Sequence, residues 1–143
     1  MTTLKNVKHM QIDVIKMRLW HQALIPKLPR SQLLGLHREI CALRGNGWGK
    51  KHSTVDYVFT HPMEWLIAYH SWVMDEMINR GYNVDRKWYD VSYRGRSCEK
   101  NMYANLDLVI PLRYTSQIYP EHNDEYLREC IENLKGKGVD ICF

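Results

Sequence analysis

The segment between Pro62 and Gly81 constrains the fold of this chain more than any other. Its apolar side chains recur at the spacing i, i+3, i+4 and i+7 for about five helical turns. Proline suits the first turn of a helix and glycine its end. The stripe consists of Met63, Leu66, Ile67, His70, Val73, Met74, Met77 and Ile78. We therefore predict a long central helix and interpret its one histidine as a hydrogen-bonded core residue rather than a catalyst.

A first helix is expected after Pro29, with Ser31 as its N-cap. Its buried stripe is Leu33, Leu36, Ile40 and Leu43, and it runs to about the last of these before Gly45 stops it. At 100° per residue, Arg38 and Glu39 fall at the two margins of this stripe. A residue at such a margin can reach both the core and a ligand.

A third helix is expected from about Asn123 to Leu134, ending at Gly136. Its inward side chains are Leu127, Ile131 and Leu134. Residues 82–120 contain few helical patterns, and only Leu106–Ile110 is strand-like, limited by Pro111. The architecture is therefore expected to consist of three main helices with long connecting loops.

Length and composition support a single domain. The 143 residues match a typical domain, and 45% apolar with 25% charged residues is too hydrophobic for disorder and too interrupted by charge for a membrane span. The fold class expected is all-α, one compact domain over residues 17–143. Residues 1–16 are interpreted as an N-terminal extension or a misassigned start, because a denser pattern begins at Met17.

The net charge of +4 is unevenly distributed. Residues 1–52 carry ten basic and two acidic side chains, whereas residues 53–79 carry four acidic and no basic ones. Residues 80–100 are again basic, with a net charge of +3. A positive face formed by the two basic segments would suit a polyanion such as nucleic acid, although solvated surface charge explains the same pattern.

The four cysteines show neither a CxxC pair nor companion histidines at zinc-finger spacing. We therefore expect reduced cysteines, no metal and no cofactor. No apolar run of signal-peptide length occurs near the N-terminus, so an intracellular protein, cytoplasmic or associated with DNA, is expected.

The stretch from Gly45 to Ser53 is a glycine-rich basic turn. It is not a P-loop, because its outer glycines are four residues apart and a lysine pair displaces the expected Ser or Thr. Its backbone amides, Lys50 and Lys51 suit phosphate contact, while an ordinary helix connection remains the alternative.

Further along, residues 82–100 interleave aromatic and basic side chains, a pattern typical either of stacking on unpaired bases or of a long loop packed over helices.

Several motifs together resemble the pyrimidine dimer DNA glycosylase family, of the phage endonuclease V type. They are Arg38-Glu39, Asp56-Tyr57-Val58-Phe59, Met63-Glu64-Trp65-Leu66 and Asn79-Arg80-Gly81-Tyr82-Asn83-Val84. The resemblance covers about Met17 to Val84. It is closest to a branch that begins Met-Arg-Leu-Trp-His, as residues 17–21 do, and contains a glycine-rich run like Leu43 to Thr54.

This resemblance implies a base excision repair enzyme, a DNA glycosylase with associated AP lyase activity and hence an endonuclease. In the family an N-terminal α-amine attacks C1′ of the damaged nucleotide, expels the base and forms an imine. Glu39 matches the glutamate that supports this chemistry. The nucleophile would be the amine of Met17 if translation starts there, or that of Thr2 if translation starts at Met1 and the methionine is removed.

The expected partner is double-stranded DNA containing damaged pyrimidines, such as pyrimidine dimers, or abasic sites; no membrane is expected, and the protein is expected to be a monomer. The residues predicted to bind DNA are Arg18, Arg38, Arg44, Lys50, Lys51 and His52. One alternative is a nucleic-acid-binding protein without chemistry on the same scaffold. Another is a hydrolase that combines His52, His61 or His70 with Asp56, although no recognised metal-ligand spacing supports it.

Overall fold

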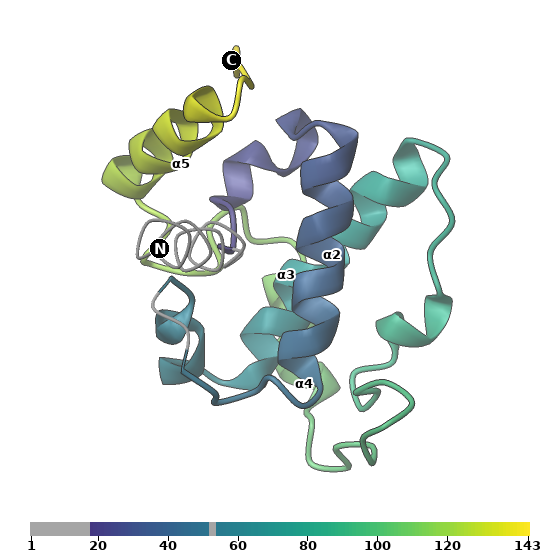
Figure 1. Cartoon of the computed structure of the whole chain (residues 1–143). Coiled ribbons are helices and arrows are strands. Elements are labelled where there is room, and N and C mark those ends of the chain that lie inside the picture. The colour runs from purple at the N-terminus through teal and green to yellow at the C-terminus, as the bar shows by residue number, and fades with distance from the viewer. Residues whose placement is uncertain (1–17, 52–53) are drawn as a thin grey trace, which may run out of the picture.

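The computed structural model describes residues 18–51 and 54–143, which fold into helices without any β-strand (Figure 1). Four α-helices are present in these residues: α2 (Arg30–Arg44), α3 (Met63–Asn79), α4 (Leu106–Leu112) and α5 (Asp124–Gly136). Three 3₁₀ helices accompany them: η1 (Gln22–Lys27) precedes α2, η2 (Asp56–Thr60) lies between α2 and α3, and η3 (Arg86–Tyr89) lies between α3 and α4. The all-α prediction is confirmed, with α2, α3 and α5 as the three main helices. The expected extension, residues 1–16, lies outside the described residues, as do Met17 and His52.

Helices α2 and α3 pack against each other and form the centre of the molecule (Figure 1). The four predicted core residues of α2 are at most 1% exposed. On α3 the predicted stripe is buried from Leu66 to Met77, and Tyr69 and Ser71 beside it are buried as well. Burial on so much of its circumference identifies α3 as the central helix, as its sequence pattern predicts.

The predicted N-cap of the first helix is wrong by two residues. Pro29 holds the N-cap position with extended backbone, and Ser31 lies inside the first turn, where its hydroxyl bonds the Gln32 side chain at 2.9 Å. A proline just before the helix fixes the backbone without needing a side-chain cap. The predicted stop at Gly45 is confirmed.

The strand predicted at Leu106–Ile110 is also wrong, because these residues form most of α4. The Asn105 side chain accepts a hydrogen bond from the backbone N–H of Asp107 at 2.9 Å and so caps the helix. Val109 is buried against α3 while its neighbours are exposed. A short apolar run does not distinguish strand from helix by periodicity, and here the cap and the contact with α3 favour the helix.

Helix α5 lies apart from the α2–α3 pair, beside η1 (Figure 1). Asn123 caps it by accepting a hydrogen bond from the Tyr126 N–H at 2.9 Å. Its inward face is centred on Cys130 and Leu134, which are fully buried, whereas the predicted Leu127 and Ile131 are only partly buried. None of the described helices is both long and apolar enough to cross a membrane.

Candidate active site and nucleic-acid interface

The described chain begins at Arg18, and the residues that follow it are held by tyrosine hydroxyls. The carbonyl oxygen of Leu19 accepts hydrogen bonds from Tyr126 at 2.6 Å and from Tyr57 at 3.4 Å. The carbonyl oxygen of Trp20 accepts one from Tyr69. We call Tyr57, Tyr69 and Tyr126 the tyrosine clamp. They come from η2, α3 and α5, so three separate elements fix the same two residues of the chain.

His122 links Gln22 to Tyr57 through hydrogen bonds and so connects the two ends of this segment. The Gln22 N–H donates to Nδ1 of His122 at 3.2 Å, so the ring proton lies on Nε2. That nitrogen lies 2.7 Å from the Tyr57 hydroxyl, which in turn donates to Leu19. Burial lowers the pKa of His122 to about 3, so its ring is neutral at pH 7. Burial likewise raises the pKa of Tyr57, so its hydroxyl stays a donor.

Arg18 itself is predicted to bind DNA, but its side chain is only 16% exposed and bonds Glu129 of α5 at 3.4 Å. It therefore ties the start of the described chain to α5. Met17, the predicted nucleophile, lies outside the described residues, two positions before the first clamped carbonyl.

Glu39 and Arg38 lie on α2 in different environments. Glu39 is partly buried, whereas Arg38 is exposed. Arg38 borders an open depression of about 530 Å³ beside the first half of α2, whose other lining residues are Pro29, Arg30, Ser31 and Leu34. Two arginines therefore face a groove on the surface of the helix that carries the predicted catalytic glutamate.

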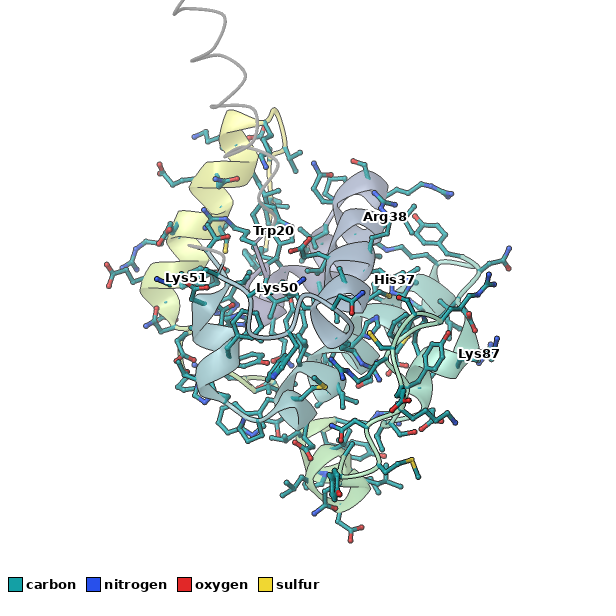
Figure 2. All side chains as sticks on the ribbon, turned by 60° about the horizontal axis from the view of Figure 1, so that its bottom comes forward. Trp20, His37, Arg38, Lys50, Lys51 and Lys87 are labelled. Atoms are coloured by element: carbon teal, nitrogen blue, oxygen red, sulfur yellow. The ribbon has the colours of Figure 1, made fainter. Side chains whose placement is uncertain are left out.

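Lys50 and Lys51 are exposed on the loop that follows α2 (Figure 2). The loop is folded back on the core, because the Trp48 ring meets Phe59 edge to face with centroids 5.0 Å apart. The lysines are thus presented from a loop with its own aromatic anchor. His52, the remaining residue predicted here, lies outside the described residues.

Arg44 is buried, although it is predicted to bind DNA. Its side chain is 0% exposed, and its guanidinium donates to the backbone carbonyls of Trp88, Asp90 and Tyr93 at 2.7, 3.0 and 3.1 Å. Burial lowers its pKa to about 10, which still leaves it charged at pH 7. Arg44 therefore has no surface for a phosphate, and its observed role is to hold residues 88–93 onto the helix pair.

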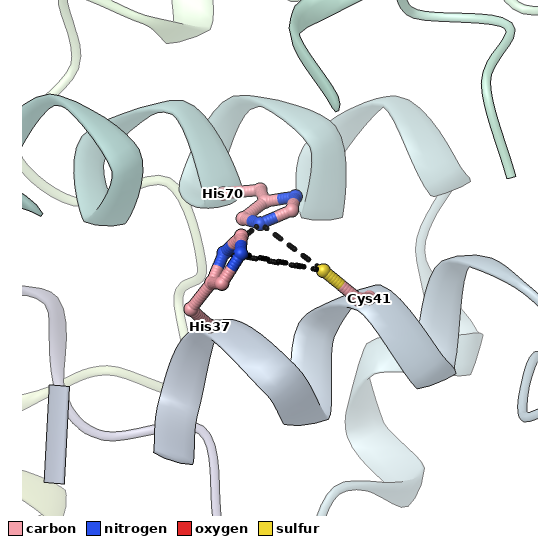
Figure 3. Close-up of side chains that lie close together, drawn as sticks. All are labelled: His37, Cys41 and His70. Atoms are coloured by element: carbon pink, nitrogen blue, oxygen red, sulfur yellow. Dashed lines mark hydrogen bonds between the residues drawn. The ribbon is translucent and has the colours of Figure 1, made fainter. Parts of the chain in front are cut away.

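Beside Arg44, the side chains of His37 and Cys41 on α2 meet His70 on α3 (Figure 3). The ring nitrogens Nδ1 of His37 and Nε2 of His70 are 2.9 Å apart, and Cys41 Sγ lies 3.9 and 4.0 Å from them. Tetrahedral zinc would require about 3.3 Å between two nitrogens and about 3.6 Å between nitrogen and sulfur. The spacing of the three ligand atoms is thus near that of a metal site.

The hydrogen-bond directions oppose metal binding at this cluster. Nη1 of Arg44 lies 2.9 Å from Nδ1 of His70, and an arginine can only donate. Nδ1 therefore accepts, and the proton of His70 lies on Nε2, where a metal would need a lone pair. A histidine that binds a metal normally donates its other N–H to an acceptor, which Arg44 is not. The arrangement is instead a relay of hydrogen bonds from Arg44 through His70 to His37.

Two histidines of the alternative hydrolase, His61 and His70, lie among the described residues, and both contact other groups. His61 bonds both carboxylate oxygens of Glu121 at 2.9 and 3.0 Å and stacks on Trp65 with centroids 4.2 Å apart. His70 is fully buried between His37 and Arg44. Glu121 and Arg44 are therefore charged groups that orient these two rings.

Sequence reasoning missed the tyrosine clamp and His122. The clamp residues are far apart in the chain, and a hydroxyl that bonds a backbone carbonyl leaves no local sequence pattern. One signal in the sequence is Tyr69, which lies beside the predicted apolar stripe of α3 and has a hydroxyl that needs a partner once buried.

A family model described as pyrimidine dimer DNA glycosylase matches residues 17–90, which is more than half of the chain. The match starts at Met17 and includes α2, α3 and the loop with Lys50 and Lys51, while α4 and α5 lie beyond it. Comparison with curated proteins and with solved structures finds no match. The extent of the family match shows that this chain belongs to the pyrimidine dimer DNA glycosylase family.

Proposed function

We propose that this protein is a DNA glycosylase with AP lyase activity that excises damaged pyrimidines from duplex DNA. Family membership implies DNA as the substrate. The nucleophile is the α-amine of Met17, and Glu39 assists the sugar chemistry. The observation that carries the proposal is the tyrosine clamp, which fixes the backbone of Leu19 and Trp20 just after the proposed nucleophile.

The reaction follows from the chemistry of a terminal amine. Its nitrogen forms a bond to C1′ while the bond from C1′ to the base breaks, and the base leaves with a proton. Opening of the sugar gives an imine, from which elimination cleaves the strand. An α-amine has a pKa near 8, so roughly a tenth is unprotonated at pH 7, against less than about a thousandth of an ordinary lysine.

The clamp contributes by limiting the positions that residue 17 can reach. A nucleophile held near its target reacts faster because the entropy of alignment is lost on folding rather than during the reaction. Met17 stands two positions before Leu19, the first residue with a clamped carbonyl, so its amine has a short reach from a fixed point. The partly buried Glu39 has a setting suited to stabilising positive charge on the sugar or moving a proton.

Borohydride trapping tests the proposal. We would incubate the full chain and a form that starts at Met17 with dimer-containing or abasic duplex DNA, reduce, and look for a covalent adduct. The Met17 form should give the adduct, and acetylation of its terminus should abolish it. Glu39→Gln should greatly reduce strand cleavage, while Glu132→Gln, on the exposed side of α5, should not. Absence of adduct and cleavage with both forms would refute the imine mechanism.

A nucleic-acid-binding protein without chemistry is the second candidate, favoured by the exposure of Arg38, Lys50 and Lys51. Removal of one cation that binds a phosphate should lower the slope of log affinity against log salt by about 0.9. The Lys50→Ala, Lys51→Ala double variant should therefore lower that slope by about 2. DNA binding with this salt dependence, together with no adduct from either form, would favour this second function.

A further inference from the structure

Exposed apolar side chains gather in one segment of the molecule. Seven large hydrophobic residues are exposed in the described part of the chain, and six of them lie between residues 102 and 114. They are Met102, Tyr103, Leu106, Leu108, Ile110 and Tyr114. Tyr103 is the most exposed, at 95%, and Met102 next to it is 78% exposed. An aromatic ring left almost entirely in water loses the burial that normally stabilises it, so such clusters often mark an interaction surface.

The turn that presents these two side chains is anchored on both sides. Its first residue, Asn101, donates its N–H to the Ser92 carbonyl at 2.8 Å, and its side chain accepts from the Tyr103 N–H at 3.1 Å. At the other side, the Asn105 N–H donates to the Glu64 carboxylate at 2.9 Å. The turn therefore holds Met102 and Tyr103, which we call the 102–103 tip, away from the core.

The chain leading to this tip packs against the loop that carries Lys50 and Lys51. Arg94 donates to the carbonyls of Arg44 and Gly45 at 2.7 and 2.8 Å, and Cys98 Sγ lies 3.1 Å from the Asn46 side-chain oxygen. The approach is close enough that a Cβ on Gly45 would lie 2.9 Å from the Arg94 carbonyl oxygen. Both loops thus lie at the same end of the α2–α3 pair, the lower end in Figure 1.

The two adjoining loops, residues 45–51 and 94–101, are strongly basic. They contain five cationic side chains, Lys50, Lys51, Arg94, Arg96 and Lys100, and one acidic side chain, Glu99. Arg94 is occupied at the end of α2, and Lys100 pairs with Asp90 at 3.1 Å. Lys50, Lys51 and Arg96 are exposed. An apolar tip beside exposed cations is complementary to a duplex, which offers base faces between two rows of phosphates.

We propose that the 102–103 tip inserts into a groove of the duplex, where Tyr103 and Met102 unstack a base step while the exposed cations bind flanking phosphates. Apolar side chains that separate base steps are a common device for deforming DNA, and enzymes that act on a base must take it out of the stack. The inference rests on the proposed function, because it assumes DNA as the ligand. It adds a DNA contact from a segment beyond residues 17–90, where the family match ends.

The test compares two exposed tyrosines of the same segment. The full chain, Tyr103→Ala and Tyr114→Ala are titrated into a dimer-containing duplex with 2-aminopurine next to the lesion, whose fluorescence rises on unstacking. Tyr114, 84% exposed after the other end of α4, is the matched control. Tyr103→Ala should lose most of the fluorescence rise at saturation and bind about tenfold more weakly, whereas Tyr114→Ala should stay within about twofold of wild type.

The outcomes separate this inference from the proposed function. If wild type is trapped by borohydride and Tyr103→Ala matches it in affinity and fluorescence, insertion is refuted and the glycosylase proposal stands. If wild type neither binds the duplex nor is trapped, both proposals fail. If sedimentation shows a dimer that Tyr103→Ala abolishes while DNA binding is unchanged, the tip contacts a second copy of the chain and insertion is again refuted.

Discussion

Two buried histidine networks hold this molecule together, and they differ in charge and in the part of the chain they fix. In the first, Arg44 donates to His70, which donates to His37. In the second, the Gln22 N–H donates to His122, which donates to Tyr57, and the three hydroxyls of the tyrosine clamp donate to the carbonyls of Leu19 and Trp20. Each network takes its direction from a group that can only donate, an arginine in one and a backbone N–H in the other.

The two networks are expected to have different roles, the first in stability and the second in the reaction. The first contains a buried cation and ends on the carbonyls of residues 88–93, so it holds a connection over the helix pair. The second is neutral and ends on Leu19, two positions after the proposed nucleophile in the sequence. Breaking the first should therefore act on stability, and loosening the second should act on the reaction.

The largest expected effect is the loss of Arg44. Arg44→Met removes a fully buried guanidinium and leaves three backbone carbonyls and the His70 ring without their donor. Each buried group without a partner costs about 1–3 kcal/mol, so the free energy of unfolding should fall by about 3 kcal/mol or more. Urea denaturation at pH 7.5 measures this loss.

Arg38→Met is the matched control for this prediction. Its side chain lies on the same helix but is exposed, so stability should change by less than about 0.5 kcal/mol while the salt slope of DNA binding falls by about 0.9. Wild-type stability in Arg44→Met, together with a reduced salt slope, would show that Arg44 binds DNA after all.

The second network should make stability depend on pH. The pKa of His122 falls from 6.5 to about 3 on folding, so below pH 6.5 the unfolded chain takes up a proton that the native state does not. Stability is then fully present above pH 6.5 and is lost as the pH falls toward 3, by about 2 kcal/mol at pH 5. The pKa values of His21, His37 and His70 are lowered mainly by burial, so these groups contribute in the same direction.

Urea denaturation at pH 7.5, 6 and 5 measures this dependence, and His122→Gln assigns it. The variant should be less stable at every pH, but its loss between pH 6 and 5 should be smaller than that of wild type by about 1.2 kcal/mol. An equal loss in the two proteins would mean that His122 does not titrate in this way.

For the first network, the sequence predicts the two helices correctly but not the burial of Arg44 between them and residues 88–93. The 3.6-residue period places α2, α3 and the burial of His70 correctly, because long amphipathic helices are specified locally. The prediction that Arg44 binds DNA does not anticipate the full burial of its side chain, since cations are normally exposed. The burial of Arg44 depends on three carbonyls more than 40 residues away, which no spacing within α2 reveals.

The second network could not be predicted from the sequence either, because its contacts also join residues that are far apart in the chain. Its members come from η2, α3, α5 and the turn before α5, and their contacts with Leu19 and Trp20 span 38 to 107 residues of sequence. The family resemblance predicts a catalytic role for Glu39 and a domain that starts at Met17, but only the tertiary structure brings the hydroxyls together. The same limit explains α4, whose helical state depends on an asparagine cap and on packing against α3.

A smaller effect on stability, with a specific effect on the reaction, is expected from Tyr126→Phe. The change removes the 2.6 Å hydrogen bond to Leu19 and keeps the ring, so stability should fall by about 1 kcal/mol. If the clamp positions the nucleophile, the single-turnover rate of borohydride trapping should fall at least about tenfold, with DNA affinity unchanged. Tyr89→Phe, which removes only a hydroxyl bond to Asp75, is the control. Equal trapping rates for wild type, Tyr126→Phe and Tyr89→Phe would mean that the clamp contributes to stability alone and does not position the nucleophile.

The smallest effect is expected from adding metal ions, which tests whether the histidines and cysteine beside Arg44 bind a metal. The ligand atoms of His37, Cys41 and His70 lie within 4.8 Å of one another, yet Arg44 fixes the proton of His70 on the nitrogen a metal would use. A divalent ion would also meet the buried guanidinium charge, which the low interior dielectric leaves unscreened. Equimolar Zn²⁺ should therefore leave the Tm of the full chain unchanged, as it should that of Cys41→Ser. A rise in Tm for wild type alone would mean that the ion displaces Arg44 from His70. His37, Cys41 and His70 would then form a metal site that Arg44 occupies when no metal is bound.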